Sequence, residues 1–151
     1  MKVFLDTNIF LEYFKRRRQH EAVGQLLNAI EDGQVRAVVS VGCIYTLAYL
    51  VRMELKRQGI HRPEQTERLR KTLNIVLSMA TVAGISHKRM SIGTNDTAFD
   101  DVEDGFQYQC ALQNKCDAFV TINLRDYRGV DIQKIEVYSP VEFVNKVLHQ
   151  D

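Results

Sequence analysis

The chain opens on a short apolar run that stops at an aspartate, in the order Lys2-Val3-Phe4-Leu5-Asp6-Thr7-Asn8. The run suits a buried strand, and the residues after it follow helical spacing, with Ile9, Phe10 and Phe14 among the apolar positions. Parallel α/β sheets build their sites at the carboxyl ends of their strands, which is where Asp6 falls. A helix cap is the simpler role for Asp6, but Asn8 already offers one, and a buried carboxylate is costly without a partner. The run therefore favours a functional carboxylate.

Strand-like and helical segments alternate along the rest of the chain. Strands are expected at 35–39, 117–122 and 135–138, and helices from about 20 to Gly33, from Ser40 to Gly59, from Pro63 to near Gly84, from about 100 to 112, and from Ser139 onward. The segment 85–98 contains glycine and asparagine breakers and is expected to be a short strand or turn followed by an irregular loop. This alternation predicts an α/β fold: one domain over residues 1–151, with a central parallel sheet flanked by helices in three layers.

Composition excludes several classes of protein. Hydrophobic residues make up 45% of the chain and charged residues 26%, which are ordinary globular values. The net charge is +1, so a nucleic-acid partner would have to be bound by locally concentrated basic residues. The three cysteines lack the spacing of a zinc site and cannot all pair in disulfides. No apolar stretch is long enough to span a bilayer, and the start does not resemble a signal peptide, so we expect a cytoplasmic protein without membrane association.

Two further acids lie in contexts similar to that of Asp6. Asp104 falls early in a predicted helix, and Asp126 follows the strand-like run that ends at Ile122. Local roles would account for both: Asp101 could cap the helix, with Glu103 and Asp104 complementing its dipole, and Asp126 could belong to a turn capped by Asn123. However, the four acids between positions 100 and 104 repel one another unless a cation offsets their charge. Three converging carboxylates would bind a hard divalent cation and indicate phosphoester chemistry.

Several short sequence motifs, taken in their order along the chain, resemble those of the PIN-domain family. This family of metal-dependent ribonucleases includes the VapC-type toxins of bacterial toxin–antitoxin pairs. The phrases that carry the resemblance are Phe4-Leu5-Asp6-Thr7-Asn8, Asp101-Val102-Glu103-Asp104 with Gln107-Tyr108 and Cys110-Ala111-Leu112, Val120-Thr121-Ile122-Asn123-Leu124-Arg125-Asp126-Tyr127, and Tyr138-Ser139-Pro140-Val141-Glu142-Phe143. The order and spacing of these phrases extend over nearly the whole chain.

The resemblance implies a site and partners. Asp6, Asp104 and Asp126 would be the catalytic and metal-binding acids, holding one or two Mg²⁺ or Mn²⁺ ions for hydrolysis of RNA phosphodiesters. Thr121 and Asn123 would lie beside them, and Asn8 would orient Asp6. The resemblance also implies an antitoxin protein and a second copy of the chain as candidate partners.

One position departs from the family pattern. The family carries a further acid, often glutamate, in the helix after the second strand, and the matching position here holds Thr46. A hydroxyl brings no negative charge, so affinity for a hard cation should fall, unless Asp101 or Glu103 supplies the missing charge. The alternative to a ribonuclease is therefore a catalytically weakened or inactive PIN-like domain that binds nucleic acid.

Basic residues are concentrated in the run Lys15, Arg16, Arg17 and Arg18, which follows the first predicted helix. Neutralisation of phosphates supplies most sequence-independent affinity for nucleic acid, so this run is the preferred RNA contact. Arg68, Arg70 and Lys71 lie on a predicted helix and are expected to form a solvated face instead.

Overall fold

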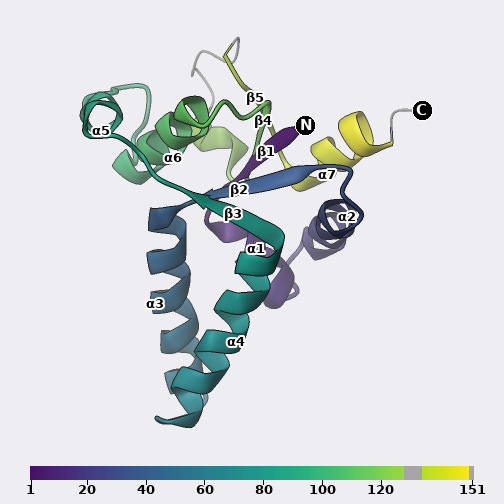
Figure 1. Ribbon diagram of the computed structural model, residues 1–151, viewed down its shortest axis with the longest axis vertical. Helices are drawn as coiled ribbons and strands as arrows, with labels where there is room; N and C mark the ends of the chain where they lie inside the picture. Colours follow the sequence, from purple (N-terminus) through teal and green to yellow (C-terminus); the bar gives the residue numbers. More distant parts are fainter. Residues whose placement is uncertain (128–133, 150–151) are drawn as a thin grey trace.

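The computed structural model describes residues 1–127 and 134–149, and its centre is a parallel sheet (Figure 1). The sheet has five strands in the order β3-β2-β1-β4-β5. Their bounds are β1 Lys2–Leu5, β2 Arg36–Ser40, β3 Ala80–Ala83, β4 Ala118–Val120 and β5 Glu136–Tyr138. Strand β1 lies in the middle and pairs with β2 through Val3 and Ala37 and with β4 through Val3 and Ala118. The residue after β1 is therefore at the centre of the carboxyl edge.

The helices that cover this sheet begin and end close to the expected positions in most cases. They are α1 Asn8–Phe14, α2 His20–Glu31, α3 Val41–Arg57, α4 Glu64–Met79, α5 His87–Thr94, α6 Val102–Gln113 and α7 Pro140–Phe143. A 3₁₀ turn at Leu124–Tyr127 follows β4, and a π-helical turn at Val144–Leu148 follows α7. The turn expected at 123–128 is thus observed up to Tyr127, and Arg128 lies outside the described residues.

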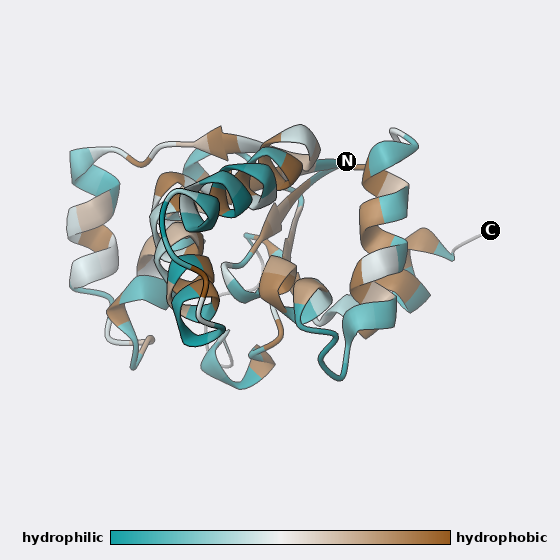
Figure 2. Ribbon diagram, turned by 90° about the horizontal axis from the view of Figure 1, so that it is seen from below, coloured by the Kyte–Doolittle hydropathy of each residue, from teal (hydrophilic) through white to brown (hydrophobic). Residues whose placement is uncertain are grey.

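The two faces of the sheet bury different sets of side chains, because successive residues of a strand point to opposite faces. Val3 and Leu5 pack on one face in a core shared with helices α1, α2, α3, α4 and α7. Phe4 points to the other face, where its ring stacks on Phe119 with centroids 5.0 Å apart, in a core shared with α6. The strands are largely apolar in Figure 2, whereas the helices show polar and apolar residues side by side. The predicted three-layer α/β/α architecture is confirmed.

Helix caps account for several boundaries. The Ser40 hydroxyl accepts a hydrogen bond from the Cys43 amide at 3.0 Å and starts α3. The Asp101 carboxylate accepts from the Glu103 amide at 2.9 Å and starts α6. Ser139 forms a capping box with Glu142 at the start of α7. These local signals lie within a few residues of each other, which is why the sequence predicts them.

Helices α3 and α4 form a hairpin that projects away from the sheet (Figure 1). Its far end, nearest the viewer in Figure 2, is predominantly hydrophilic. Within the described ranges no helix is both long and apolar enough to cross a membrane.

Three expectations for local structure are wrong. The helix expected to reach Gly84 ends at Met79, because Ala80 begins β3 and pairs with Ala37 of β2. The segment expected to be irregular contains helix α5, capped by the Ser86 hydroxyl, which accepts from the Arg89 amide at 3.2 Å. Asn8 does not cap α1: it is the first helical residue, and Thr7 occupies the cap position without a side-chain hydrogen bond.

Gly93, one of the residues that suggested a loop in this segment, instead lies where α5 and α6 approach closely. A Cβ atom built on Gly105 of α6 would lie 2.9 Å from the carbonyl oxygen of Gly93 of α5. Only a residue without a side chain fits at this contact. The close packing of α5 on α6 therefore explains why Gly93, which looks like a helix breaker in the sequence, lies within a helix.

Candidate functional site

Asp6 lies at the carboxyl end of the central strand and is 5% exposed. Its Oδ1 accepts hydrogen bonds from the Thr7 amide at 2.8 Å and from Gln107 Nε2 at 3.3 Å, and its Oδ2 accepts from Thr121 Oγ1 at 2.8 Å. Burial raises the pKa of Asp6, and the hydrogen bonds from Thr121, Thr7 and Gln107 oppose that effect. The site thus holds a carboxylate that is desolvated but surrounded by donors.

One of these donors, Thr121, is itself held in place by a hydrogen bond. Thr121 is fully buried directly after β4, and its hydroxyl accepts from the Asn123 amide at 3.0 Å while it donates to Asp6. Asn123 supports the site in this way through its backbone, and its side chain is exposed. No hydrogen bond of the described residues joins Asn8 to the Asp6 carboxylate, whose donors come from Thr7, Gln107 and Thr121.

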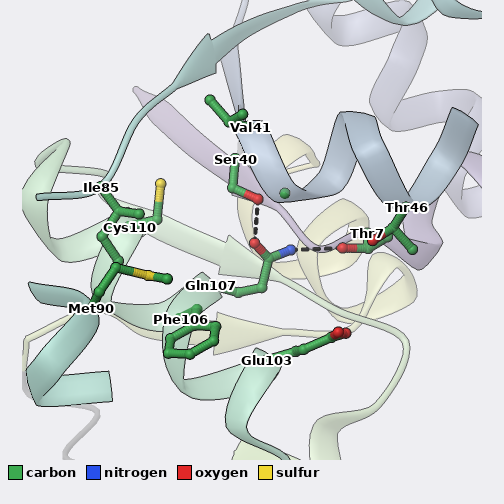
Figure 3. A pocket seen from close by; sticks show the side chains of 11 residues that line it. Thr7, Ser40, Val41, Thr46, Ile85, Met90, Glu103, Phe106, Gln107 and Cys110 are labelled. Carbon is green, nitrogen blue, oxygen red and sulfur yellow. Dashed lines mark hydrogen bonds between the residues drawn. The ribbon is translucent and has the colours of Figure 1, made fainter. Parts of the chain in front are cut away.

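Gln107 is the residue of the site that sequence reasoning missed. It is buried in α6, donates from Nε2 to Thr7 Oγ1 at 2.8 Å as well as to Asp6, and accepts from the Ser40 hydroxyl. Figure 3 shows this side chain between Ser40 and Thr7. Gln107 follows Asp104 by one helical turn, so its position on the same face of α6 was the available signal.

Asp104 lies in the first turn of α6 and is half-buried. Burial raises its pKa to about 7, with further contributions from the charges of Asp6, Asp101 and Asp126. The Tyr127 hydroxyl donates to Asp104 Oδ1 at 3.4 Å, and burial raises the pKa of this tyrosine too. Asp6, Asp104 and Asp126 therefore lie close enough to influence one another, although they are far apart in the sequence.

Asp126 lies in the 3₁₀ turn after β4 and is exposed. Asp101 is exposed and serves as the cap of α6. No three acidic, histidine or cysteine side chains of residues 1–127 and 134–149 are gathered as a ready metal-binding group. The acids thus influence one another electrostatically without forming a closed ligand set.

Thr46 and Glu103 lie in a neighbouring pocket rather than among these acids. The pocket has a volume of about 210 Å³ and is lined by residues of α3, α5, α6 and the strand ends, among them Thr7, Ser40 and Gln107. Thr46 lines this pocket together with Thr7, which directly follows Asp6 in the chain, and Figure 3 draws the two threonines in the same part of the pocket. A side chain at position 46 therefore reaches the edge of the acidic site, whereas the charge of Glu103 is not among those that raise the pKa of Asp104.

The basic run Lys15, Arg16, Arg17 and Arg18 is exposed and follows the end of α1. Seven helical residues separate it from the Thr7 cap, which corresponds to about 10 Å along the helix axis. Arg16 has a φ of 47°, in the left-handed region, and lets the chain turn toward α2. Helix α1 therefore separates the run from the end of β1 that carries Asp6.

A family model described as PIN domain matches residues 2–125 of the chain. The chain belongs to the PIN-domain family. PIN domains are generally nucleases that depend on divalent metal ions, and the resemblance found in the sequence is confirmed at the level of the family. No curated protein matches the sequence.

Solved structures show the same fold at low sequence identity. The PIN domain superposes on a chain of VapBC2 from Rickettsia felis, solved bound to a DNA fragment from its promoter, with a TM-score of 0.66, 14% identity, and coverage of 92% of this chain and 98% of that one. A chain of VapBC-1 from nontypeable Haemophilus influenzae superposes with a TM-score of 0.62 at 18% identity, over 93% of this chain and 99% of that one. A chain of FitAcB from Neisseria gonorrhoeae superposes with a TM-score of 0.61 at 16% identity, over 92% of this chain and 98% of that one. At these identities the comparisons establish the fold.

The site fits a divalent cation in chemistry and in charge. Its candidate ligands are carboxylate and hydroxyl oxygens, which suit hard cations such as Mg²⁺ or Mn²⁺. The mutual repulsion that contributes to the raised pKa of Asp104 would be relieved by a bound cation. Since Asp126 is exposed and Asp104 half-buried, rotation of these two side chains would be needed to complete a ligand set.

Proposed function

We propose that this PIN domain is a metal-dependent endoribonuclease and the toxin of a toxin–antitoxin pair, acting in the cytoplasm as one domain over residues 1–151. The observation that carries the proposal is the buried Asp6 carboxylate at the carboxyl end of the central strand, beside an Asp104 whose pKa is raised to about 7 by burial and by Asp6, Asp101 and Asp126. Carboxylates whose pKa is raised by burial and by neighbouring charges are typical of functional sites.

In this proposal Asp6, Asp104 and Asp126 hold one or two Mg²⁺ or Mn²⁺ ions. A bound divalent cation would supply Lewis-acid activation of water and neutralise charge on the scissile phosphate. Asp6 would be the fixed ligand, because Thr121, Thr7 and Gln107 hold its two oxygens in one orientation. Asp104 would bind in its ionised form, since a cation favours loss of its proton.

The remaining residues would position and bind the substrate. Thr121 and the Asn123 amide form a relay that orients Asp6 Oδ2. Asp101 fixes the start of α6, and therefore the place of Asp104, through its cap. Thr46 and Glu103 would contribute oxygen groups from the neighbouring pocket, and Asn8, the first residue of α1, would help to orient Asp6. Lys15, Arg16, Arg17 and Arg18 would contact RNA phosphates.

Two partners are part of the proposal. The structural neighbours from Klebsiella pneumoniae, described as a toxin–antitoxin complex, and from Haemophilus influenzae, described as VapBC-1, favour an antitoxin protein as a partner of this chain. A homodimer is proposed on the family resemblance. Copurification with the product of an adjacent gene and light scattering of the purified chain would test the two partners separately.

A second candidate function is a PIN domain that binds nucleic acid without cleaving it. Thr46 favours this alternative, because it brings no charge to the edge of the site where the family carries an acid. A protein of this kind would bind Mn²⁺ weakly and leave RNA intact.

The deciding experiment is cleavage of a pool of labelled RNAs with Mn²⁺, Mg²⁺ or a chelator, next to the Asp6→Asn variant. Cleavage that the chelator and the variant both abolish would support the ribonuclease. Absence of cleavage together with absence of Mn²⁺ binding by calorimetry would favour the nucleic-acid-binding alternative.

A further inference from the structure

A second concentration of positive charge lies at the far end of the α3–α4 hairpin. An open pocket of about 610 Å³ is lined there by Arg52, Met53, Lys56, His61, Arg62 and Gln65. Arg52 and Lys56 are four residues apart on α3 and so share one face of the helix, and Arg62 precedes α4. None of the described residues that line this pocket carries a carboxylate.

The carboxylates nearest in sequence are engaged by other arginines. Glu54 accepts from Arg57 Nε at 2.9 Å, and hydrogen bonds from Arg57 lower the pKa of Glu54 to about 2. Glu64 pairs with Arg68 at 2.8 Å. Among the described residues, no ion pair involves Arg52, Lys56 or Arg62. Like charges four residues apart on a helix destabilise it, so this arrangement gains most from a bound anion.

The position of the pocket separates it from the acidic site. Arg52 lies eleven residues beyond Val41, which corresponds to about 17 Å along α3 from the helix end that adjoins the Ser40–Gln107 network. The hairpin projects from the sheet, and its far end is hydrophilic (Figures 1 and 2). An extended polyanion bound at the acids could reach this pocket, whereas a single nucleotide could not occupy both.

We propose that this pocket binds the phosphate backbone of the RNA substrate at a distance from the cleavage site, an inference that rests on the proposed function. RNA fits better than an acidic peptide because, of the described residues that line the pocket, Met53 alone is apolar, whereas the strongest contacts of protein interfaces come from apolar or aromatic anchors. Contacts of arginine and lysine to phosphate are independent of base sequence and depend strongly on salt. The pocket therefore contributes affinity for long substrates and no sequence preference.

The test compares two matched double variants of the hairpin. Arg52→Gln with Lys56→Gln removes two unpaired cations of the pocket, and Arg57→Gln with Arg68→Gln removes two paired cations of the same hairpin. Binding of a single-stranded RNA of about 20 nucleotides is measured by fluorescence anisotropy in chelator over a range of salt concentrations. Circular dichroism melting confirms that both variants fold.

We expect the pocket variant to bind the RNA several-fold more weakly at low salt. The slope of log K against log salt concentration should fall in magnitude by about 1.4, or about 0.7 for each lost phosphate contact, and the control variant should keep the original slope. An unchanged slope in the pocket variant, or an equal change in both variants, would overturn the proposal.

Two competitors separate this proposal from other anionic ligands. If the pocket variant bound a poly-glutamate peptide more weakly than the parent did but bound RNA equally well, the pocket would be a peptide site and the proposal would be overturned. If inorganic phosphate displaced RNA as effectively as unlabelled RNA does, the pocket would take free anions. Because binding is measured in chelator, the result does not depend on catalysis. If the pocket variant showed the expected loss of RNA binding but the protein cleaved no RNA with any metal, the proposed ribonuclease activity would be overturned and the proposed RNA-binding pocket would stand.

Discussion

Gln107 Nε2 lies 3.3 Å from Asp6 Oδ1 and 2.8 Å from Thr7 Oγ1, so one amide of α6 ties together the end of β1 and the start of α1. The same side chain accepts from the Ser40 hydroxyl, which caps α3. Three segments that are far apart in the sequence, at Asp6–Thr7, Ser40 and Gln107, therefore meet at one buried amide. This relationship places the helices around the proposed catalytic carboxylate.

Replacing Gln107 by leucine should destabilise the protein by about 1–3 kcal/mol, because Ser40 and Thr7 lose a buried hydrogen-bond partner. Replacement by glutamate retains the acceptor for Ser40 but places a second carboxylate beside Asp6. The glutamate variant should therefore lose more stability at about pH 8 than at about pH 5. Urea unfolding at both pH values measures this. A leucine variant as stable as the parent would show that the network adds no net stability.

The Asp6→Asn variant should lose metal-dependent cleavage and keep its fold. The asparagine preserves an acceptor for Thr7 and removes a carboxylate whose pKa is raised by burial, so its thermal stability should equal or exceed that of the parent near neutral pH. Cleavage with Mn²⁺ and thermal melting are measured on the same preparation. Undiminished cleavage by this variant would contradict the proposed role of Asp6.

The raised pKa of Asp104 predicts how the stability of the metal-free protein varies with pH. Its pKa is about 7 in the folded protein against a usual value of 3.8, so between these values the folded state binds more protons than the unfolded state. Stability should therefore fall as the pH rises from about 4 to about 7. The full difference in pKa would correspond to about 4 kcal/mol of unfolding free energy. Because solvent partly screens Asp104, we expect the free energy of unfolding to change by about 1–2 kcal/mol.

Urea unfolding in chelator at about pH 5 and about pH 8 tests this expectation. The Asp104→Asn variant should show a smaller difference between the two conditions, because it removes one of the two carboxylates whose pKa is raised and leaves Asp6. Stability that rises with pH in the parent, or a variant with the same pH dependence, would show that the Asp104 pKa is not raised.

Thr46→Glu should increase affinity for Mn²⁺ by roughly tenfold, because it adds a carboxylate at the edge of the acidic site. Thr46→Gln is the matched control, since it adds a similar volume without charge. Isothermal titration calorimetry measures both affinities. If the two variants bound Mn²⁺ equally, position 46 would be too far from the ion to matter.

The run after α1 should bind RNA through its charge. Arg17→Gln with Arg18→Gln should weaken binding and lower the salt slope in magnitude by about 1.4. Arg16 is left unchanged, because its φ of 47° makes substitution there a change in backbone strain as well as in charge. Arg70→Gln with Lys71→Gln, on α4, is the control and should leave the slope unchanged. Equal effects in the two double variants would mean that the run has no special role.

Local patterns were sufficient wherever the signal and the structure lie within a few residues. The strand that ends just before Asp6 and the caps at Ser40 and Ser139 depend on neighbouring positions, and all three are observed as expected. The cap at Asp101, which the sequence offered as an alternative role for this acid, is observed as well. The local expectation for Asn8 was wrong because the helix begins one residue earlier than the polar side chain suggested, with Thr7 at the cap.

Long-range contacts decided the rest. Residues 80–83 form a strand because they pair with β2, and α5 forms where Gly93 packs against Gly105 of α6, so both depend on partners that no local window contains. The sequence by itself determined the alternation of strands and helices and the acids at Asp6, Asp104 and Asp126. Only the tertiary structure brought Gln107 to Asp6, raised the pKa of Asp104, and gathered Arg52, Lys56 and Arg62 around one pocket. Burial and charge proximity are properties of three-dimensional neighbours, and for these residues the neighbours come from other elements of the chain.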